Sequence, residues 1–271
     1  MRLVCLMCAA MAIGAVGSQP DSEADRVESV ARAYAEGVLD GDAVRVQRAS
    51  HPLLAKRRVD HEYWGEASRA WLRSVTHEQL PAMIDYLHES GAVSPASTKL
   101  EVEVLDIVGS CASAKIRSDV GVQLVHLVRL GGEWLVAHDA YELADAKGDG
   151  GSDSKIRAKV ADYARGFYAR DASKTLGSCH TSLAKHSVVR SPDGVEMLDP
   201  MSHEELGLLA QAYNAYWKFD ARGSKREISV LATEGTIAAV RLDAENWTEL
   251  MHLAKLDDEW LIIDVLTVDR P

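Results

Sequence analysis

Two histidines, His126 and His252, are the first residues of this chain to consider for chemistry. Each lies in an alternating strand whose neighbours on the same face are aliphatic. A buried imidazole needs a hydrogen-bond partner or a ligand, and it can gain or lose a proton near neutral pH. We expect a structural histidine with satisfied hydrogen bonds in each case. A place in a pocket wall and a role as catalytic base are the alternatives.

Asp264 follows His252 in sequence and could be its partner carboxylate. Asp257 and Asp258 are expected to form a two-residue turn, and residues can be paired by counting outward from that turn. The count places Asp264 on the face of Trp260, opposite the face that carries His252. The pattern therefore predicts no His252–Asp264 dyad.

Further candidates come from helices and from one variable segment. Tyr34 and Tyr163 should project from the first helix of each half, with the ring in the core and the hydroxyl at a pocket wall. His51 and His180 follow a second, short helix, so a helix-end role is expected, with pocket lining as the alternative. The candidate pocket-lining residues are Tyr34, His51, Trp64, His126, Tyr163, His180, Trp247 and His252.

Established catalytic motifs are missing from the sequence. It contains no nucleophile elbow, zinc-protease helix, phosphate-binding loop or dinucleotide fingerprint. The glycine-rich stretch 145–153 superficially resembles a calcium loop. However, Lys147 and Ile156 stand where that loop needs oxygen ligands. We therefore expect no cofactor, no metal and no identifiable catalytic residue.

These candidates lie on a duplicated hairpin. The strand pairs 124–138 and 246–264 each have a two-residue turn followed by Glu-Trp-Leu. Gly131 and Gly132 suit a turn with positive φ, and two aspartates replace them in the second copy. The pairing that follows places Arg129 opposite Trp134 and Lys255 opposite Trp260, so a cationic side chain lies beside an indole in both copies.

The duplication extends over most of the chain. Adding 129 to a residue number relates the helical patterns 25–39 and 155–169, and the offset becomes 126 after segments 60–74 and 189–201. Those two segments do not match, so we interpret them as variable loops that set binding specificity. Asp42 and Asp171 can cap a second helix, and capping boxes at 76–79 and 202–205 predict a third. The expected order is three helices and about four antiparallel strands, twice.

Composition and termini limit the functional classes. The chain has 271 residues and a net charge of −11, which disfavours nucleic acid as partner. Residues 1–18 are typical of a signal peptide, which predicts a secreted or periplasmic protein without membrane insertion after cleavage; an uncleaved tether is the alternative.

The expected domains are 22–143 and 155–271, joined by a linker at 144–154. Cys111 and Cys179 are expected as buried free thiols, with an inter-domain bridge as alternative.

The order of elements resembles the nuclear transport factor 2-like fold, an α+β cone whose curved antiparallel sheet wraps around the first helix. The segment from Trp247 to Ile263, together with Gly41-Asp42 and His51-Pro52, resembles the putative lumazine-binding, SnoaL-related group of that superfamily. The resemblance implies two tandem cones, each with a pocket between helix and sheet. Gly121 stands where the second copy has Trp247, so one of the two pockets is expected to be degenerate.

This superfamily contains isomerases, cyclases, dehydratases and non-catalytic binders, so the fold alone does not determine an activity. We expect an exported, non-catalytic protein that binds a small apolar or aromatic molecule. An enzyme of the cyclase, isomerase or dehydratase kind, with a His or Asp base in the cone, is one alternative, and a structural interaction module is another. The two copies should pair through their sheets as an intramolecular pseudo-dimer and form a monomer in solution.

Overall fold

The computed structural model describes residues 22–64, 67–93, 99–144 and 153–268. The predicted signal peptide and residues 145–152 of the predicted linker lie outside the described residues. No helix in the described ranges is both long and apolar enough to cross a bilayer.

Each half of the chain begins with helices. As expected, Ser202 forms a capping box, and the Asp42 and Asp171 side chains accept hydrogen bonds from Arg45 N and Lys174 N. A further capping box, at Ser22, starts the first helix. The predicted capping box at Thr76 is also present, and it is followed by one 3-10 turn and then by an α-helix. The helical elements are α1 (Glu23–Asp40), α2 (Ala43–Ala49), η1 (His77–Gln79), α3 (Leu80–Glu89), α4 (Asp153–Ala169), α5 (Ala172–Leu176) and α6 (His203–Ala212).

Two six-stranded sheets follow the same order, β2-β1-β6-β5-β4-β3 and β8-β7-β12-β11-β10-β9. Their strands are β1 (Ser50–Trp64), β2 (Ala67–Thr76), β3 (Glu101–Val108), β4 (Cys111–Ser118), β5 (Gly121–Leu130), β6 (Glu133–Leu143), β7 (Cys179–Arg190), β8 (Glu196–Met201), β9 (Arg226–Glu234), β10 (Ile237–Ala244), β11 (Thr248–Leu256) and β12 (Glu259–Val268). The α+β class with two tandem copies is thus confirmed. One pairing in each sheet, β1 with β6 and β7 with β12, is parallel, so the sheets are mixed.

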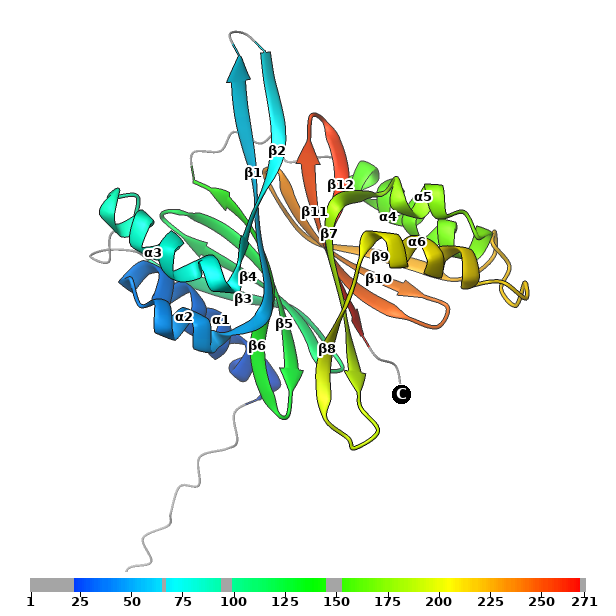
Figure 1. Cartoon of the computed structure of the whole chain (residues 1–271), viewed down its shortest axis with the longest axis horizontal. Helices are drawn as coiled ribbons and strands as arrows, with labels where there is room; N and C mark the ends of the chain where they lie inside the picture. Colours follow the sequence, from blue (N-terminus) through cyan, green and yellow to red (C-terminus); the bar gives the residue numbers. More distant parts are fainter. Residues whose placement is uncertain (1–21, 65–66, 94–98, 145–152, 269–271) are drawn as a thin grey trace, which may run out of the picture.

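The segments interpreted as variable loops are strands, and that interpretation was wrong. Residues 60–64 and 67–74 lie in the paired strands β1 and β2, and residues 189–201 include the end of β7, the whole of β8 and the turn between them. The first hairpin extends beyond its sheet in Figure 1. Its alternation is hidden because charged residues occupy both faces. Asp60 pairs with Arg58 on its own strand and with Arg73 on the neighbouring strand.

The hairpin turns and the pairing around them are as predicted. Gly131 and Gly132 have φ of 58° and 90°, and the two aspartates of the second turn have φ of 45° and 68°. Arg129 pairs with Trp134, with its guanidinium 5.6 Å from the ring centroid, and Lys255 pairs with Trp260. Both tryptophans are buried in the core of their own domain.

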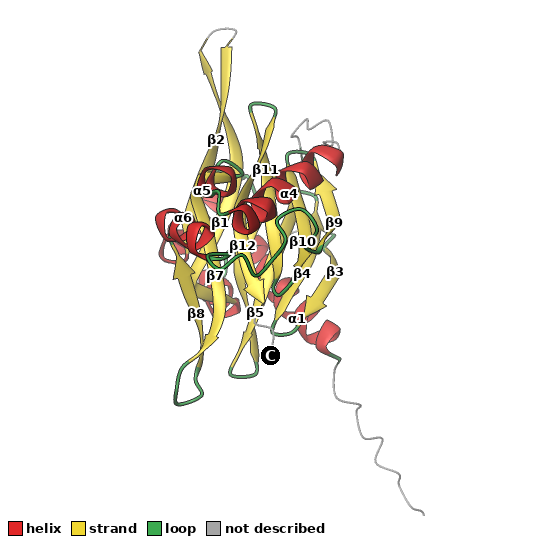
Figure 2. Cartoon of the chain, turned by 90° about the vertical axis from the view of Figure 1, so that its right-hand side faces the viewer, coloured by secondary structure: helices red, strands yellow, loops and turns green. Residues whose placement is uncertain are grey.

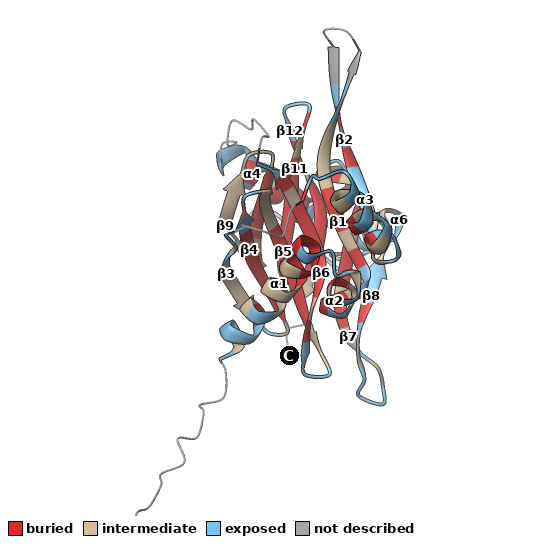
Figure 3. Ribbon diagram, turned by 90° about the vertical axis from the view of Figure 1, so that its left-hand side faces the viewer, coloured by how far each residue is buried: buried red, intermediate tan, exposed pale blue. Residues whose placement is uncertain are grey.

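The helices lie on the outer faces of the two sheets, and the sheets face each other across the middle of the molecule (Figure 1). Figure 2 shows α4, α5 and α6 in front of the second sheet, and Figure 3 shows α1, α2 and α3 in front of the largely buried first sheet. Between the sheets, Val128 and Ala137 of the first domain pack with Leu250 and Leu266 of the second. The two copies therefore associate sheet to sheet within one chain.

Both described cysteines are free and buried, as first expected, so the alternative of an inter-domain bridge was wrong. Cys111 lies in the layer between the sheets, whereas Cys179 lies in the core of the second domain. Burial raises the pKa of the Cys111 thiol to about 12 and that of Cys179 still further. Neither thiol is an activated nucleophile.

Candidate functional site

The first domain contains a pocket of about 350 Å³ at the open end of its cone. Its volume is within the usual range for small-molecule sites, roughly 300–1,000 Å³. Helices α1 and α3 and strands β1, β5 and β6 supply most of its wall. The apolar part includes Val38, Met83, Leu87 and Val93, and the polar part includes Lys56, Arg58, Gln123 and Tyr141.

A buried polar cluster of Tyr34, Lys56 and Asp139 lies behind the pocket wall. The Tyr34 hydroxyl donates a hydrogen bond to Asp139 Oδ2 at 2.9 Å, and Lys56 forms an ion pair with the same oxygen. Tyr34 and Asp139 are fully buried, and neither contributes to the pocket lining, whereas Lys56 does. Burial first, and then the charge of Asp139, raise the pKa of Tyr34, so the phenol stays protonated as a donor. Lys56 therefore separates the carboxylate from the pocket.

Sheet topology brings Lys56 and Asp139 together. They are direct partners across the parallel pair β1–β6, although 83 positions separate them in sequence. Tyr34 reaches them from α1, where it shares the buried helical face with Val27, Ala31 and Val38. Only Tyr34 of this trio was predicted from the sequence. A signal for Lys56 was available, because the same residue type recurs at Lys185 in the other copy.

The second domain builds an equivalent cluster with a carboxylate from another strand. Lys185 pairs with Glu249 on β11, and the Tyr163 hydroxyl lies 3.3 Å from Glu249 Oε1. With the offset of 126, Glu249 corresponds to Gln123, and Asp139 corresponds to Val265. The tyrosine and the lysine are thus retained while the acid has changed strand. The sequence repeat could not reveal this exchange because the two acids are not aligned.

Aromatic rings fill the cone of the second domain. Trp247 lies 5.6, 5.3 and 5.0 Å from the ring centroids of Phe167, Tyr168 and Tyr213, and its indole nitrogen donates to Glu249 Oε2 at 3.1 Å. In the first domain the corresponding residue is Gly121. A Cβ there would fall 2.1 Å from the carbonyl oxygen of Glu142, so no side chain can replace this glycine without a backbone shift. The copy without the tryptophan therefore has the open pocket.

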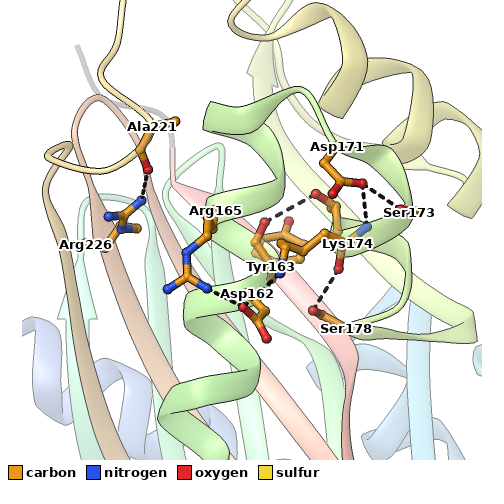
Figure 4. Close-up of polar contacts among 10 residues, drawn as sticks. Asp162, Tyr163, Arg165, Asp171, Ser173, Lys174, Ser178, Ala221 and Arg226 are labelled. Carbon is orange, nitrogen blue, oxygen red and sulfur yellow. Dashed lines mark hydrogen bonds and ion pairs between the residues drawn. The ribbon is translucent and has the colours of Figure 1, made fainter.

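The α4–α5 junction holds Tyr163 in place (Figure 4). Thr175 Oγ1 donates to the carbonyl oxygen of Tyr163 at 3.3 Å, and Asp171 accepts from the Lys174 amide at 3.1 Å. The residue before Tyr163, Asp162, pairs with Arg165 one turn later at 2.6 Å on the exposed side of the helix. The tyrosine is therefore a fixed part of a packed core and has no solvent-facing role.

His126 and His252 lie between the two sheets and not in the cone. Their rings stack with centroids 3.6 Å apart, and both are fully buried. His126 Nδ1 is 3.2 Å from His138 Nδ1, and His138 Nε2 is 2.7 Å from His186 Nδ1. The pocket-lining alternative for His126 and His252 was therefore wrong. We call His126, His138, His186, His252, Arg57 and Asp264 the interface cluster.

The prediction that Asp264 and His252 lie on opposite faces was also wrong. His252 Nδ1 is 3.2 Å from Asp264 Oδ2, because a β-bulge interrupts the register: His252 pairs with Asp264 but Leu253 pairs with Ile262. The extra residue, Ile263, moves Asp264 to the other face of the strand. The equivalent bulge at Ala137 turns His138 toward His126. Counting outward from a turn fails beyond such an insertion.

The interface cluster is nearly two-fold symmetric. By the same offsets, Arg57 corresponds to His186 and His138 to Asp264. The His138–His186 contact is therefore the counterpart of the Arg57–Asp264 contact, in which Nε and Oδ1 are 3.6 Å apart. Burial, then the neighbouring imidazoles, lower the pKa of His126 and of His138. Burial lowers the pKa of His186 to about 4. These three imidazoles are neutral near pH 7.

His51 and His180 begin β1 and β7. Each ring Nδ1 accepts a hydrogen bond of 3.1 Å from the backbone amide two residues later, at Leu53 and Ser182. Both rings are about half-buried, and burial lowers the pKa of each. They close turns at the strand starts and do not contribute to the described pocket wall. Trp64 is the last residue of β1, and its side chain lies outside the described residues.

Sequence reasoning missed the polar residues of the pocket wall, Lys56, Arg58, Gln123 and Tyr141. They lie on three strands, so only the folded sheet brings them together. Among the residues that the structure describes, no group of three or more His, Cys, Asp or Glu side chains is arranged to hold a metal ion.

Comparison with known proteins places the first domain in a family. Residues 22–142 match the model of a family described as putative lumazine-binding. The first domain belongs to this family. The second domain is its internal repeat, with the same strand order and the same Tyr–Lys pair.

Several solved structures are similar to one half of the chain. A nuclear transport factor 2-like protein of unknown function from Shewanella baltica is 22% identical, with a TM-score of 0.36 over 43% of this chain and 90% of that one. A ketosteroid isomerase-like protein from Erwinia carotovora is 14% identical, with a TM-score of 0.35 over 46% of this chain and 98% of that one. No curated protein matches the chain.

Proposed function

We propose that this chain is an exported, non-catalytic protein that binds a small apolar or aromatic molecule in the cone of its first domain. The observation that carries the proposal is the contrast between the two copies. One cone has an open pocket of about 350 Å³, and the other is filled by Trp247 and the rings around it. A largely apolar pocket with a few fixed polar groups suits a compact ligand.

The surroundings of Asp139 favour binding over catalysis. A general base in the cone would need an available carboxylate or imidazole within hydrogen-bond reach of the substrate. Asp139 is buried beneath Lys56 and already neutralised by it. The histidines of the interface cluster lie between the sheets, on the far side of β5 and β6 from α1. A cyclase, isomerase or dehydratase reaction would require another base.

The second domain supports the first in this proposal. Its filled cone gives a rigid aromatic core, and its sheet covers the apolar face of the first sheet that points away from the helices. Exposed alone, that face would be a large apolar surface prone to association. The structural role of the second copy thus complements the binding role of the first.

Native mass spectrometry of the protein recovered from the exported fraction tests both the export of the chain and its binding of a small molecule. The intact mass should lack the leading segment, and one small molecule should remain bound per chain. The variant Met83→Trp fills the pocket wall and should lose that ligand. The control Leu209→Trp changes the matching position of α6 in the second domain and should retain it. Equal ligand retention by both variants, or a bound molecule that wild type converts to product, would overturn the proposal.

A further inference from the structure

The second domain replaces two left-handed glycines of the first domain by large side chains. Gly41 and Gly91 lie just after α1 and α3, with φ of 75° and 70°, where a glycine suits the left-handed backbone. With the offsets of 129 and 126, their counterparts are Arg170 and Trp217. Both counterparts keep this backbone, with φ of 58° and 52°. Because a bulky residue is strained there, each of these side chains is held at a conformational cost.

The two replacements contact each other on the surface. Arg170 Cζ lies 5.6 Å from the centroid of the Trp217 ring, and Arg170 Nε donates to the carbonyl oxygen of Gln211 at 2.9 Å. Trp217 is 66% exposed and the preceding residue, Tyr216, is 96% exposed. In the first domain the position of Tyr216 is taken by Ser90. The second domain therefore presents two aromatic rings beside a cation where the first domain has small residues.

A buried asparagine fixes the loop that carries these rings, residues 214–219. Asn214 Nδ2 donates to the carbonyl oxygens of Tyr168 and Phe219 at 2.7 and 2.9 Å, and Asn214 Oδ1 accepts from the Phe219 amide at 3.0 Å. Phe219 itself packs against the core of the second domain. Residues 216–218, between these two anchors, are all exposed. The loop thus holds three exposed side chains on a firm support.

The segment around this loop is basic, although the whole chain has a net charge of −11. Residues 213–226 contain one carboxylate, Asp220, and four cationic residues, Lys218, Arg222, Lys225 and Arg226. The matching segment of the first domain, 87–100, has one lysine, one glutamate and no Phe, Trp or Tyr. Within the described ranges, Arg170 and Lys218 contact aromatic rings but form no ion pair. Their charges are therefore available to an anionic partner.

Shape and chemistry favour a lipid bilayer as that partner. The segment after α6 lies at the right-hand edge of Figure 1, at the end of the second domain away from the first. A protruding loop fits a deformable surface, whereas a bound peptide is usually held in a groove or along a strand edge. Tyr and Trp are enriched at membrane–water interfaces, where the ring meets apolar chains and the polar tip meets water. Neighbouring cations attract anionic headgroups.

We propose that the loop 214–219 binds the surface of an anionic phospholipid bilayer, with Tyr216 and Trp217 in the headgroup region and with Arg170 and Lys218 facing lipid phosphates. The contact is peripheral, and it does not depend on the ligand of the first-domain pocket. The remainder of the chain is acidic and is repelled by the same bilayer, which leaves this end of the second domain as the part that approaches it.

Co-sedimentation with vesicles tests the proposal on protein recovered from the exported fraction. The vesicles contain phosphatidylcholine alone or an equal mixture of phosphatidylcholine and phosphatidylglycerol. Each cation near an anionic surface contributes about fivefold in affinity, so wild type should bind the mixed vesicles at least about fivefold more tightly.

Three variants separate the contributions. Trp217→Gly introduces the first-domain residue and should weaken binding to the mixed vesicles at least about tenfold. Lys218→Ala, which introduces the residue type of Ala92, should weaken the same binding about fivefold. Tyr86→Ser removes an exposed aromatic ring from α3 and should bind as wild type does. The melting temperature of Trp217→Gly should equal or exceed that of wild type, because glycine relieves the left-handed backbone.

Absence of vesicle binding by wild type, or equal binding by wild type and Trp217→Gly, would overturn the proposal. Equal affinity of wild type for the two kinds of vesicle would overturn it as well. Binding of wild type to polyglutamate but to neither kind of vesicle would assign the loop to an acidic polypeptide, against the bilayer.

Discussion

Acidification should weaken this protein through the interface cluster, and His186 allows the effect to be calculated. Burial lowers the pKa of His186 from 6.5 to about 4 in the folded chain. The unfolded chain therefore binds the proton first, so stability is fully present above pH 6.5 and is lost progressively as pH falls toward 4. The complete loss from this residue is about 3 kcal/mol, of which about 2 kcal/mol has occurred at pH 5.

Neighbouring groups act on His186 in both directions. Asp264 favours its charged form, whereas Arg57, His51 and Lys185 oppose it. His126 and His138 also have a lowered pKa, so their protonation adds destabilisation of the same sign. The loss measured for the whole protein between pH 7.5 and pH 5 should therefore exceed the contribution of His186 alone.

Urea unfolding followed by tryptophan fluorescence at pH 7.5 and pH 5 measures the free energy of unfolding directly. His186→Gln removes the titrating group and should reduce the pH-dependent loss by about 2 kcal/mol relative to wild type. His61→Gln, an exposed site on β1, is the matched control and should leave the loss unchanged. The reasoning is refuted if His186→Gln and wild type lose the same stability between the two pH values.

Three further predictions follow from single contacts. Asp264→Asn leaves Arg57 and His252 without their buried carboxylate and should cost about 3 kcal/mol in urea unfolding, whereas Asp258→Asn on the exposed turn should be near neutral. Gly121→Ala should lower the melting temperature more than Gly132→Ala, because only Gly121 has a backbone oxygen within 2.1 Å of the added Cβ; the reverse order would contradict this account. Light scattering should give the mass of one chain, since the sheet faces are already covered within the molecule, and a doubled mass would disprove it.

Local patterns in the sequence were sufficient to predict the helices, the caps at Asp42, Asp171 and Ser202, and the two hairpin turns. A capping box or a glycine turn depends on residues within four positions of each other, so its geometry is encoded where it occurs. The duplication was also readable, because offsets of 129 and 126 keep residue types in register. These features predicted two tandem α+β units and placed Tyr34 and Tyr163 in their cores.

The site and the interface depended on contacts between distant strands. Lys56 meets Asp139 through a parallel pairing that no local spacing specifies. One inserted residue, Ile263, reversed the face of Asp264 and joined it to His252. Because side-chain direction in a strand alternates at every residue, a single bulge changes every later assignment. Contacts between distant segments also decided which cone stays open, because Trp247 packs among rings contributed by other elements.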